Sequence, residues 1–155
     1  MGNYHLAQMN IATALYDMED PRMTGFVNKL DEVNALAEQA PGFVWRLQSD
    51  SGSAVDIKVY DDPNIIINMS VWEDADSLFE YTYHTDHVRV FADRAKWFHN
   101  HNKVPALVLW WVPAGRLPDE QEGKDKLEHL RAHGPSPEAF TLKKRFPAPE
   151  PNPVS

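Results

Sequence analysis

Two residues capable of acid–base and anion-binding chemistry lie inside an otherwise apolar stretch of the sequence, between residues 86 and 101. At about 100° per residue, a helix through this stretch places His87 and Arg94 near the middle of its apolar arc. A cation there is costly unless a partner or a polar cavity receives it. Two interpretations stay open. Either the two residues are satisfied structural groups, or they line a pocket, with His87 as acid, base or metal ligand and Arg94 orienting an anion.

Polar side chains interrupt other apolar faces as well. Gln8 and Asn10 share one face of an apolar segment near the start of the chain, and Asn68 and Ser70 share a face with Trp72. A mostly apolar pocket with a few hydrogen-bonding groups has this composition. The pocket predicted from the sequence therefore contains Asn10, Asn68, Trp72, His87 and Arg94.

The elements that must position these residues follow from hydrophobic periodicity and from turn signals. The pattern predicts strands at 4–11, 43–48, 65–72 and 104–112, with residues 55–60 extending the hairpin that begins at 43. It predicts helices at 20–40, at 74–100 with a break near 85–86, and at 118–134. This is an α+β chain of ferredoxin-like βαββαβ order with an antiparallel sheet and an extra C-terminal helix.

The chain is expected to form one domain over residues 1–145, because 155 residues suit a single core. Residues 146–155 contain Pro147, Pro149, Pro151 and Pro153, so an extended or disordered tail is expected there.

Two of the predicted strands are apolar on both faces. Ile65, Ile67 and Met69 lie on one face of the strand 65–72, while Ile66 and Trp72 lie on the other. A sheet with two apolar faces must bury both. The two principal helices cover one face, so the C-terminal helix or a second copy of the sheet must cover the other. Of these alternatives we expect the second, a homodimer that closes a two-subunit α+β barrel.

Composition excludes several classes of function. The formal net charge of −8 argues against nucleic-acid binding, which depends on clustered Lys and Arg. The sequence has no cysteine, so disulfides, thiolate catalysis and Cys-ligated metals are excluded. No signal peptide or membrane-length apolar run is recognised, and we expect a cytoplasmic protein that does not bind membranes.

Seven histidines raise the question of a metal site. His129 and His133 are four residues apart, but Leu130 stands where the zinc-protease motif has glutamate. No nucleophile elbow, phosphate-binding glycine loop or dinucleotide-binding fingerprint is present. No dedicated non-haem metal site is therefore predicted.

Several short motifs, in order along residues 4–147, resemble a bacterial family of unknown function, DUF3291, within the dimeric α+β barrel superfamily. They are Pro41-Gly42-Phe43-Val44-Trp45-Arg46-Leu47, Met69-Ser70-Val71-Trp72-Glu73, His87 with Arg94, Trp97 and Phe98, Leu109-Trp110-Trp111-Val112-Pro113-Ala114-Gly115, His133-Gly134-Pro135 and Glu138-Ala139-Phe140. The superfamily includes antibiotic-biosynthesis monooxygenases, haem-degrading monooxygenases and proteins that only bind small molecules. The family itself has no settled reaction, and fold-level analogy does not deliver one.

The resemblance implies roles for particular residues. Haem-degrading members use an Asn on the first strand, a Trp at the end of the third and an iron-ligating His on the following helix. Asn10, Trp72 and His87 occupy similar places here, and His84 is an alternative iron ligand. The cofactor implied is therefore either none or haem.

Two functions remain open. The first is a monooxygenase-like enzyme, cofactor-independent or haem-assisted, acting on a hydrophobic metabolite. In it, His87 or a tyrosine such as Tyr81 removes a substrate proton, and Asn10 and Trp72 position the substrate. Asn68, Tyr81 and Trp97 complete the predicted substrate pocket, and Arg94 joins the catalytic group. The second is a non-catalytic protein that binds or senses a hydrophobic small molecule or haem.

Overall fold

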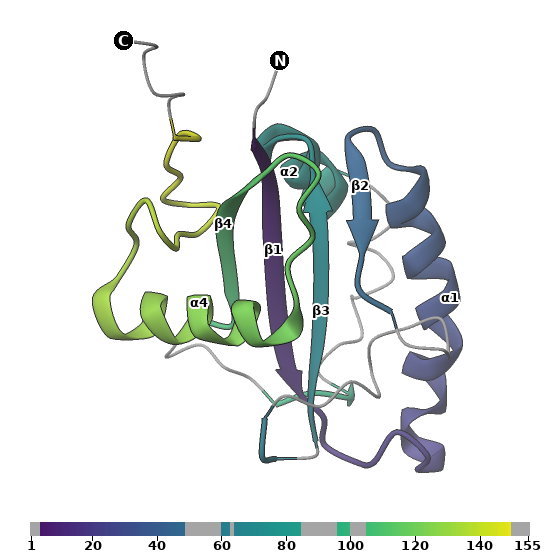
Figure 1. The fold of residues 1–155 in the computed structure, drawn as a ribbon. Helices are drawn as coiled ribbons and strands as arrows, with labels where there is room; N and C mark the ends of the chain where they lie inside the picture. The colour runs from purple at the N-terminus through teal and green to yellow at the C-terminus, as the bar shows by residue number, and fades with distance from the viewer. Residues whose placement is uncertain (1–3, 49–59, 63, 85–95, 100–104, 150–155) are drawn as a thin grey trace, which may run out of the picture.

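The computed structural model of the protein describes residues 4–48, 60–62, 64–84, 96–99 and 105–149. Within them, four strands form one antiparallel sheet in the order β2-β3-β1-β4 (Figure 1). In chain order the elements are β1 (Tyr4–Thr13), the 3-10 turn η1 (Pro21–Met23), α1 (Thr24–Gln39), β2 (Phe43–Arg46), β3 (Ile65–Trp72), α2 (Ala75–His84), β4 (Leu107–Pro113) and α4 (Glu120–His133). The predicted α+β class and ferredoxin-like order are confirmed.

Capping side chains and a glycine turn determine where several helices and strands begin. The Asp20 carboxylate accepts a hydrogen bond from the backbone N–H of Arg22 at 2.8 Å and starts the first helical segment. The Asp119 carboxylate does the same for Glu122 at 2.8 Å and caps α4. Between α1 and β2 the chain turns at Gly42, whose φ of 83° lies in the left-handed region that favours glycine.

The predicted helix at 74–100 is wrong at its C-terminal end. The backbone N–H of Leu15 donates to the carbonyl of Trp97 at 2.8 Å, and the N–H of His99 donates to the carbonyl of Thr13 at 2.9 Å. Phe98 thus forms an antiparallel bridge with Ala14, just beyond the end of β1. Trp97 and Phe98 are both buried there, and their burial, rather than helical spacing, explains why they are apolar. Most of the predicted hairpin extension at 55–60 lies outside the described residues.

The face of the sheet that packs against α1 and α2, here called the helix face, has an apolar cluster at each end. The Trp72 cluster consists of Leu6, Ala37, Trp72, Leu78, Tyr81, Leu109 and Phe140. The Trp97 cluster consists of Ala14, Met23, Phe26, Ile66, Trp97 and Phe98. Helix α1 contributes Ala37 to the first and Phe26 to the second, so it spans the length of this face.

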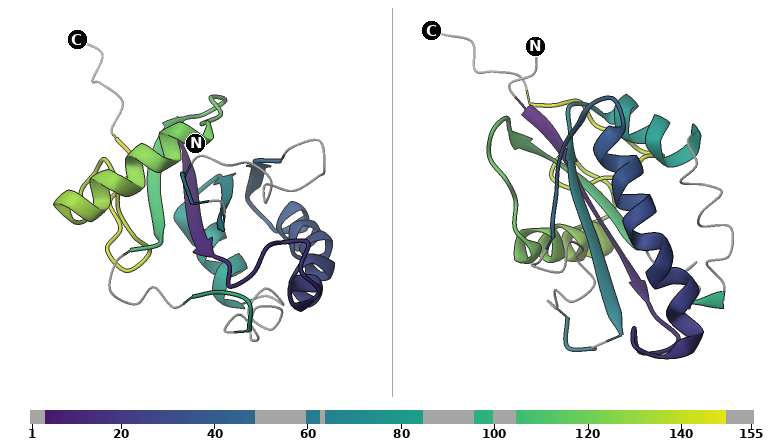
Figure 2. Two further views of the ribbon diagram at one scale, coloured as in Figure 1. Left: turned by 90° about the horizontal axis from the view of Figure 1, so that it is seen from below. Right: turned by 90° about the vertical axis from the view of Figure 1, so that its right-hand side faces the viewer.

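The opposite face of the sheet, here called the far face, is covered by α4, which lies across β4 and β1 (Figures 1 and 2). Its buried residues are Ala7, Met9, Ile11, Ile67, Met69, Val71, Val108, Trp110 and Val112, packed with Leu127 and Leu130 of α4 and with Ala139. Of the two covers considered for this face, the C-terminal helix is the one observed. The apolar residues that led us to expect a dimer are thus accounted for within one chain, and the dimer stays a prediction.

Gly123 lets α4 approach the far face closely. A Cβ atom at this position would lie 2.6 Å from both Met9 Sδ and Met69 Cε, inside van der Waals contact. Both methionines have 0% exposure, so little space exists for them to move into. We expect Gly123→Val to lower the free energy of unfolding by about 1–3 kcal/mol, the usual cost of overpacking. Urea denaturation measures it, with Ala132→Val at an exposed position of α4 as the control that changes it little.

The outer edge of β4 is closed by the segment Ala139–Phe146, here called the C-terminal strap. Leu109 and Phe140 exchange both backbone hydrogen bonds, at 2.8 and 2.9 Å. Ala139 packs in the far-face cluster while Phe140 packs in the Trp72 cluster on the helix face. The strap thus passes around the edge strand and protects backbone groups that would otherwise be open to pairing with another chain.

Among the described residues, no helix combines the length and the apolar character that crossing a bilayer requires.

Candidate functional site

Four polar side chains lie on the helix face between its two apolar clusters. They are Gln8 and Asn10 of β1 and Asn68 and Ser70 of β3, here called the polar belt. The strand register places Asn10 opposite Asn68 and Gln8 opposite Ser70. The next pairs on this face are apolar, Leu6 with Trp72 on one side and Ala12 with Ile66 on the other. Because β1 and β3 are the two central strands, the belt crosses the middle of the sheet.

Hydrogen bonds connect three of the four belt residues. Gln8 Nε2 donates to Asn68 Oδ1 and to Ser70 Oγ, both at 2.9 Å. The indole N–H of Trp72 donates to the same Ser70 oxygen at 2.8 Å. Ser70 Oγ therefore accepts two hydrogen bonds and links the belt to the Trp72 cluster. Networks of this kind restrict rotamers and preorganise a site for a ligand.

Burial differs sharply along the belt. Gln8 is 4% exposed and Ser70 is 6% exposed, so the two form the buried part of the network. Asn68 is exposed and Asn10 is partly exposed, although both lie on central strands. In a sheet face covered by helices, a mid-strand side chain is normally buried. Asn68 is therefore accessible to solvent on the helix face, next to the buried pair Gln8 and Ser70.

Aromatic side chains form the apolar end of the site nearest α2. Trp72 lies with its ring centre 5.1 Å from that of Tyr81 and 5.5 Å from that of Phe43. Trp72 has 0% exposure and its N–H is bound to Ser70. It therefore acts on the belt through Ser70 and presents no free polar group of its own.

Tyr81 is poorly suited to the role of proton acceptor that the sequence left open for it. Its hydroxyl donates to the backbone carbonyl of Val33 at 3.3 Å. Burial raises the pKa of the Tyr81 phenol well above its usual value, which disfavours the phenolate that a base would require. Tyr81 instead serves as an apolar wall beside Trp72.

Trp97 lies at the other end of the helix face. Its indole packs on α1, where a Cβ at Gly25 would come within 3.2 Å of the ring, and Phe26 lies 5.8 Å from it between ring centres. The two tryptophans predicted for the pocket therefore belong to two separate clusters, with the belt between them.

The histidine and arginine from which the pocket was first predicted cannot be placed. His87 and Arg94 lie outside the described residues, and His84 is the last residue of α2. The four belt side chains include no imidazole, carboxylate or thiolate, so the belt itself offers none of these as a ligand to a haem iron. Within the described part of the chain, no group of three or more His, Cys, Asp or Glu residues is arranged to hold a metal ion.

Gln8 and Ser70 are the site residues that the sequence interpretation passed over. Both were noted as polar residues on otherwise apolar strand faces. Only the register between β1 and β3 shows that they lie opposite each other. The signal in the sequence is two polar residues at alternate positions in each of two strands. Asn34 is a similar interruption: it is buried on α1 between Phe26 and Ala37.

Removing the Ser70 hydroxyl should destabilise the protein measurably. In Ser70→Ala, the buried N–H groups of Trp72 and Gln8 lose their shared acceptor. An unsatisfied buried donor costs about 1–3 kcal/mol, so we expect a loss of that size in the free energy of unfolding. Chemical denaturation tests this, and Ser77→Ala on α2 provides a control that leaves the belt intact. A Ser70→Ala variant as stable as wild type would contradict the network.

The fold and the belt define a ferredoxin-like α+β domain with a candidate small-molecule site on its helix face. The family model described as "Domain of unknown function (DUF3291)" matches residues 5–154. The chain belongs to this family, as its motifs indicated. A search of curated proteins finds no match.

Several solved structures have a similar fold. The NE2512 protein of unknown function from Nitrosomonas europaea is 14% identical, with a TM-score of 0.49 over 76% of this chain and 97% of that one. SnoaB, a cofactor-independent oxygenase from Streptomyces nogalater, is 16% identical, with a TM-score of 0.46 over 74% and 98%. A putative antibiotic biosynthesis monooxygenase from Nitrosomonas europaea is 13% identical, with a TM-score of 0.42 over 76% and 93%. At these identities the likeness concerns the fold alone.

Proposed function

We propose that the chain binds a hydrophobic small molecule that carries a hydrogen-bonding oxygen, on the helix face at the polar belt. The observation that carries this proposal is the exposure of Asn68 in the middle of a central strand, above the buried pair Gln8 and Ser70. The Trp72 and Trp97 clusters offer apolar contacts on either side, and the amides offer hydrogen bonds between them. Sites that bind small molecules typically have mostly apolar walls with a small number of polar groups.

Within this proposal, the reaction is a monooxygenation without a resident cofactor. A base, His87 in the prediction from the sequence, removes a proton from a methylene group that is conjugated with a carbonyl group. The resulting carbanion reduces O₂ and forms a C–O bond, which gives a hydroperoxide after protonation. Loss of the second methylene hydrogen as a proton, with cleavage of the O–O bond, then leaves a new carbonyl on the product and releases the other oxygen atom as water. The amides of Asn10 and Asn68 would bind the enolate oxygen, because fixed dipoles stabilise charge that develops in the transition state.

A non-catalytic binding or sensing protein is the second candidate, and one observation favours it. The described side chains of the belt are amides and a hydroxyl, which do not ionise near neutral pH and so make poor general acids or bases. The nearby phenol of Tyr81 is engaged with Val33 and its pKa is raised by burial. Catalysis therefore depends on a residue outside the belt, whereas binding does not.

Anthrone, a tricyclic ketone with an enolisable methylene group, separates the two candidates. Binding is measured by quenching of tryptophan fluorescence, and turnover by oxygen uptake and formation of anthraquinone. Turnover that collapses in His87→Ala while binding persists supports the enzyme. Binding without turnover supports the binding protein, and a lack of binding contradicts both for this class of ligand.

Haemin tests the haem-assisted version separately. A shift of the Soret band that saturates at one haem per chain and disappears in His87→Ala supports it. An unchanged haemin spectrum contradicts the haem version and leaves the cofactor-independent one in place.

A further inference from the structure

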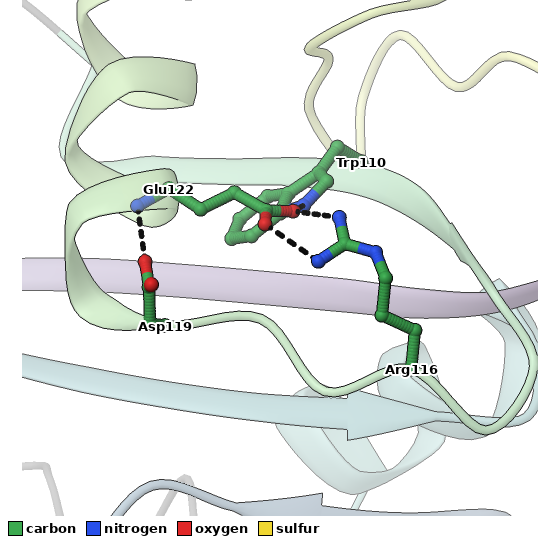
Figure 3. A network of polar contacts seen from close by, with 4 residues as sticks. All are labelled: Trp110, Arg116, Asp119 and Glu122. Carbon is green, nitrogen blue, oxygen red and sulfur yellow. Dashed lines mark hydrogen bonds and ion pairs between the residues drawn. The ribbon is translucent and has the colours of Figure 1, made fainter.

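A polar network on the far face illustrates a purely structural arrangement (Figure 3). Glu122 of α4 accepts a hydrogen bond from the indole N–H of Trp110 and a bidentate pair from Arg116, all at 2.8 Å. The donors and the carboxylate of this network satisfy one another. It attaches the first turn of α4 to the sheet and offers no group to a ligand.

The network of the polar belt differs, because it starts from a donor that cannot be reversed. The indole N–H of Trp72 can only donate, so Ser70 Oγ accepts from it, at 2.8 Å. Gln8 Nε2 donates to Ser70 Oγ and to Asn68 Oδ1, both at 2.9 Å. A hydroxyl oxygen has two lone pairs, and the bonds from Trp72 and Gln8 occupy both at Ser70. The network therefore ends at Asn68, the exposed member of the belt.

The bond from Gln8 determines which end of the Asn68 amide meets a ligand. Oδ1 of Asn68 is bound to the buried Gln8, so the end of the amide turned away from Gln8 is Nδ2, which only donates. The two amides can reverse only together, because reversing Gln8 alone would set its carbonyl oxygen against Asn68 Oδ1. In the arrangement observed, the exposed end of the network is an N–H donor.

A second donor side chain lies in the same row of the sheet. Arg46 of β2 is the register partner of Ser70, so its side chain lies on the helix face. This side chain is 11% exposed, and its Nε donates to Glu38 Oε2 of α1 at 3.1 Å. A guanidinium has only donors, so Arg46 adds none of the acceptors that an N–H group of a ligand would need.

We propose that the belt selects ligands by an acceptor oxygen, such as that of a ketone or an enolate, and that Gln8 is the positioning residue that sets this preference by holding the Asn68 amide. The inference rests on the proposed function, because it concerns the ligand of the same site. It adds that a ligand of similar size with an N–H group in place of the oxygen is rejected. Two donors would then face each other unpaired, which costs about tenfold or more in affinity.

Fluorenone and carbazole test the proposal with the full chain, because they are planar tricyclic molecules of similar size with opposite polar groups. The carbonyl of fluorenone only accepts a hydrogen bond, whereas the N–H of carbazole only donates one. In equilibrium dialysis, we expect wild type to bind fluorenone about tenfold more tightly than carbazole.

Asn68→Asp is the variant that reverses the polarity of the exposed group. It keeps the acceptor of the Gln8 bond and replaces Nδ2 with a carboxylate oxygen, so carbazole should become the preferred probe. Asn28→Asp makes the same change at an exposed position of α1 and should keep the wild-type preference. An Asn68→Asp variant that still prefers fluorenone as wild type does overturns the proposal.

Gln8→Met tests the positioning role, because it removes the amide donors with little change of shape. Ser70 keeps its bond from Trp72, and Asn68 is exposed to water, so the variant should fold. Asn68 can then turn either end toward the probe, and we expect the ratio of the two affinities to fall from about tenfold toward equality. A merely structural role of Gln8 would weaken both probes alike and leave this ratio unchanged, which would overturn its assignment.

The dialysis also separates this inference from the proposed function. If wild type binds both probes equally and Asn68→Ala weakens both, a ligand site at the belt stands and the preference for an acceptor oxygen is overturned. If wild type binds neither probe, the proposed function is contradicted, and this inference fails with it.

Discussion

Replacing Asn68 with alanine is expected to weaken binding of the anthrone probe about 5- to 150-fold, which corresponds to roughly 1–3 kcal/mol. Asn68 is the exposed amide of the belt, and Gln8 holds its Oδ1 atom in place at 2.9 Å. A ligand oxygen at the belt would lose a preorganised hydrogen-bond partner. Because Asn68 is exposed, the same change should alter the free energy of unfolding by less than about 1 kcal/mol.

The measurement is a fluorescence titration, for which the chain supplies five tryptophans. Asn28→Ala, at an exposed position on α1, is the matched control and should bind the probe like wild type. If Asn68→Ala binds the probe as tightly as wild type does, the ligand is not held at the belt. An equal loss in both variants would point to a nonspecific effect and would count against the site in the same way.

Truncating Phe140 to alanine is expected to lower the free energy of unfolding by about 3–5 kcal/mol, a large part of the stability of a domain of this size. Phe140 has 0% exposure and packs in the Trp72 cluster, with its ring centre 6.3 Å from that of Trp111 and 5.9 Å from that of Phe146. Its loss leaves a cavity where the strap passes from the far face to the helix face. The backbone hydrogen bonds between residue 140 and Leu109 at the edge of β4 then lose the side-chain packing that holds the strap in place.

Denaturation by urea, followed by circular dichroism, gives the size of this effect. Leu117→Ala is a suitable control, because Leu117 is 49% exposed and its truncation creates no cavity. The control should stay within about 0.5 kcal/mol of wild type. A Phe140→Ala variant that is also within that range would mean that the strap does not pack on β4 as described.

Much of the fold could be predicted from local patterns. The pattern of apolar and polar residues along 65–72 predicted the bounds of β3. It also predicted the face that each side chain occupies, because successive side chains of a strand point to opposite faces. Gly134 marked the C-terminal end of α4, because a helix stop depends on neighbouring residues only, whereas the predicted start at 118 lies two residues before the observed one at Glu120. The family resemblance, which rested on short continuous motifs, is confirmed by the family model that matches residues 5–154.

The remaining features depend on contacts between distant residues. Trp97 and Phe98 fit a helical arc, but Phe98 forms a bridge with Ala14 and Trp97 accepts a hydrogen bond from Leu15, which periodicity alone does not reveal. The choice of α4 as the cover of the far face depends on the close approach at Gly123. A glycine in a polar helix does not by itself indicate what lies beneath it.

The candidate site was predicted in part. Asn10, Asn68 and Trp72 lie on the helix face, as the alternation of β1 and β3 required. The sequence interpretation treated Trp72 as a group that contacts the substrate, whereas its N–H is bound to Ser70. Only the register of two strands shows that Gln8 connects Asn68 to Ser70, since the residues are 60 and 62 positions apart in the chain. The roles predicted for His87 and Arg94 stay predictions.

The side-chain amide signals of Asn68, Asn10 and Gln8 give the most direct test of the ligand site. In ¹H–¹⁵N NMR spectra recorded during titration with anthrone, we expect the Asn68 and Asn10 side-chain signals to shift in proportion to occupancy. The signal of Gln8 should follow through its hydrogen bond to Asn68, while the amide of exposed Asn28 stays unchanged. Saturable binding with shifts confined to residues of α4 and the far face, and with Asn68 unmoved, would contradict a ligand site at the polar belt.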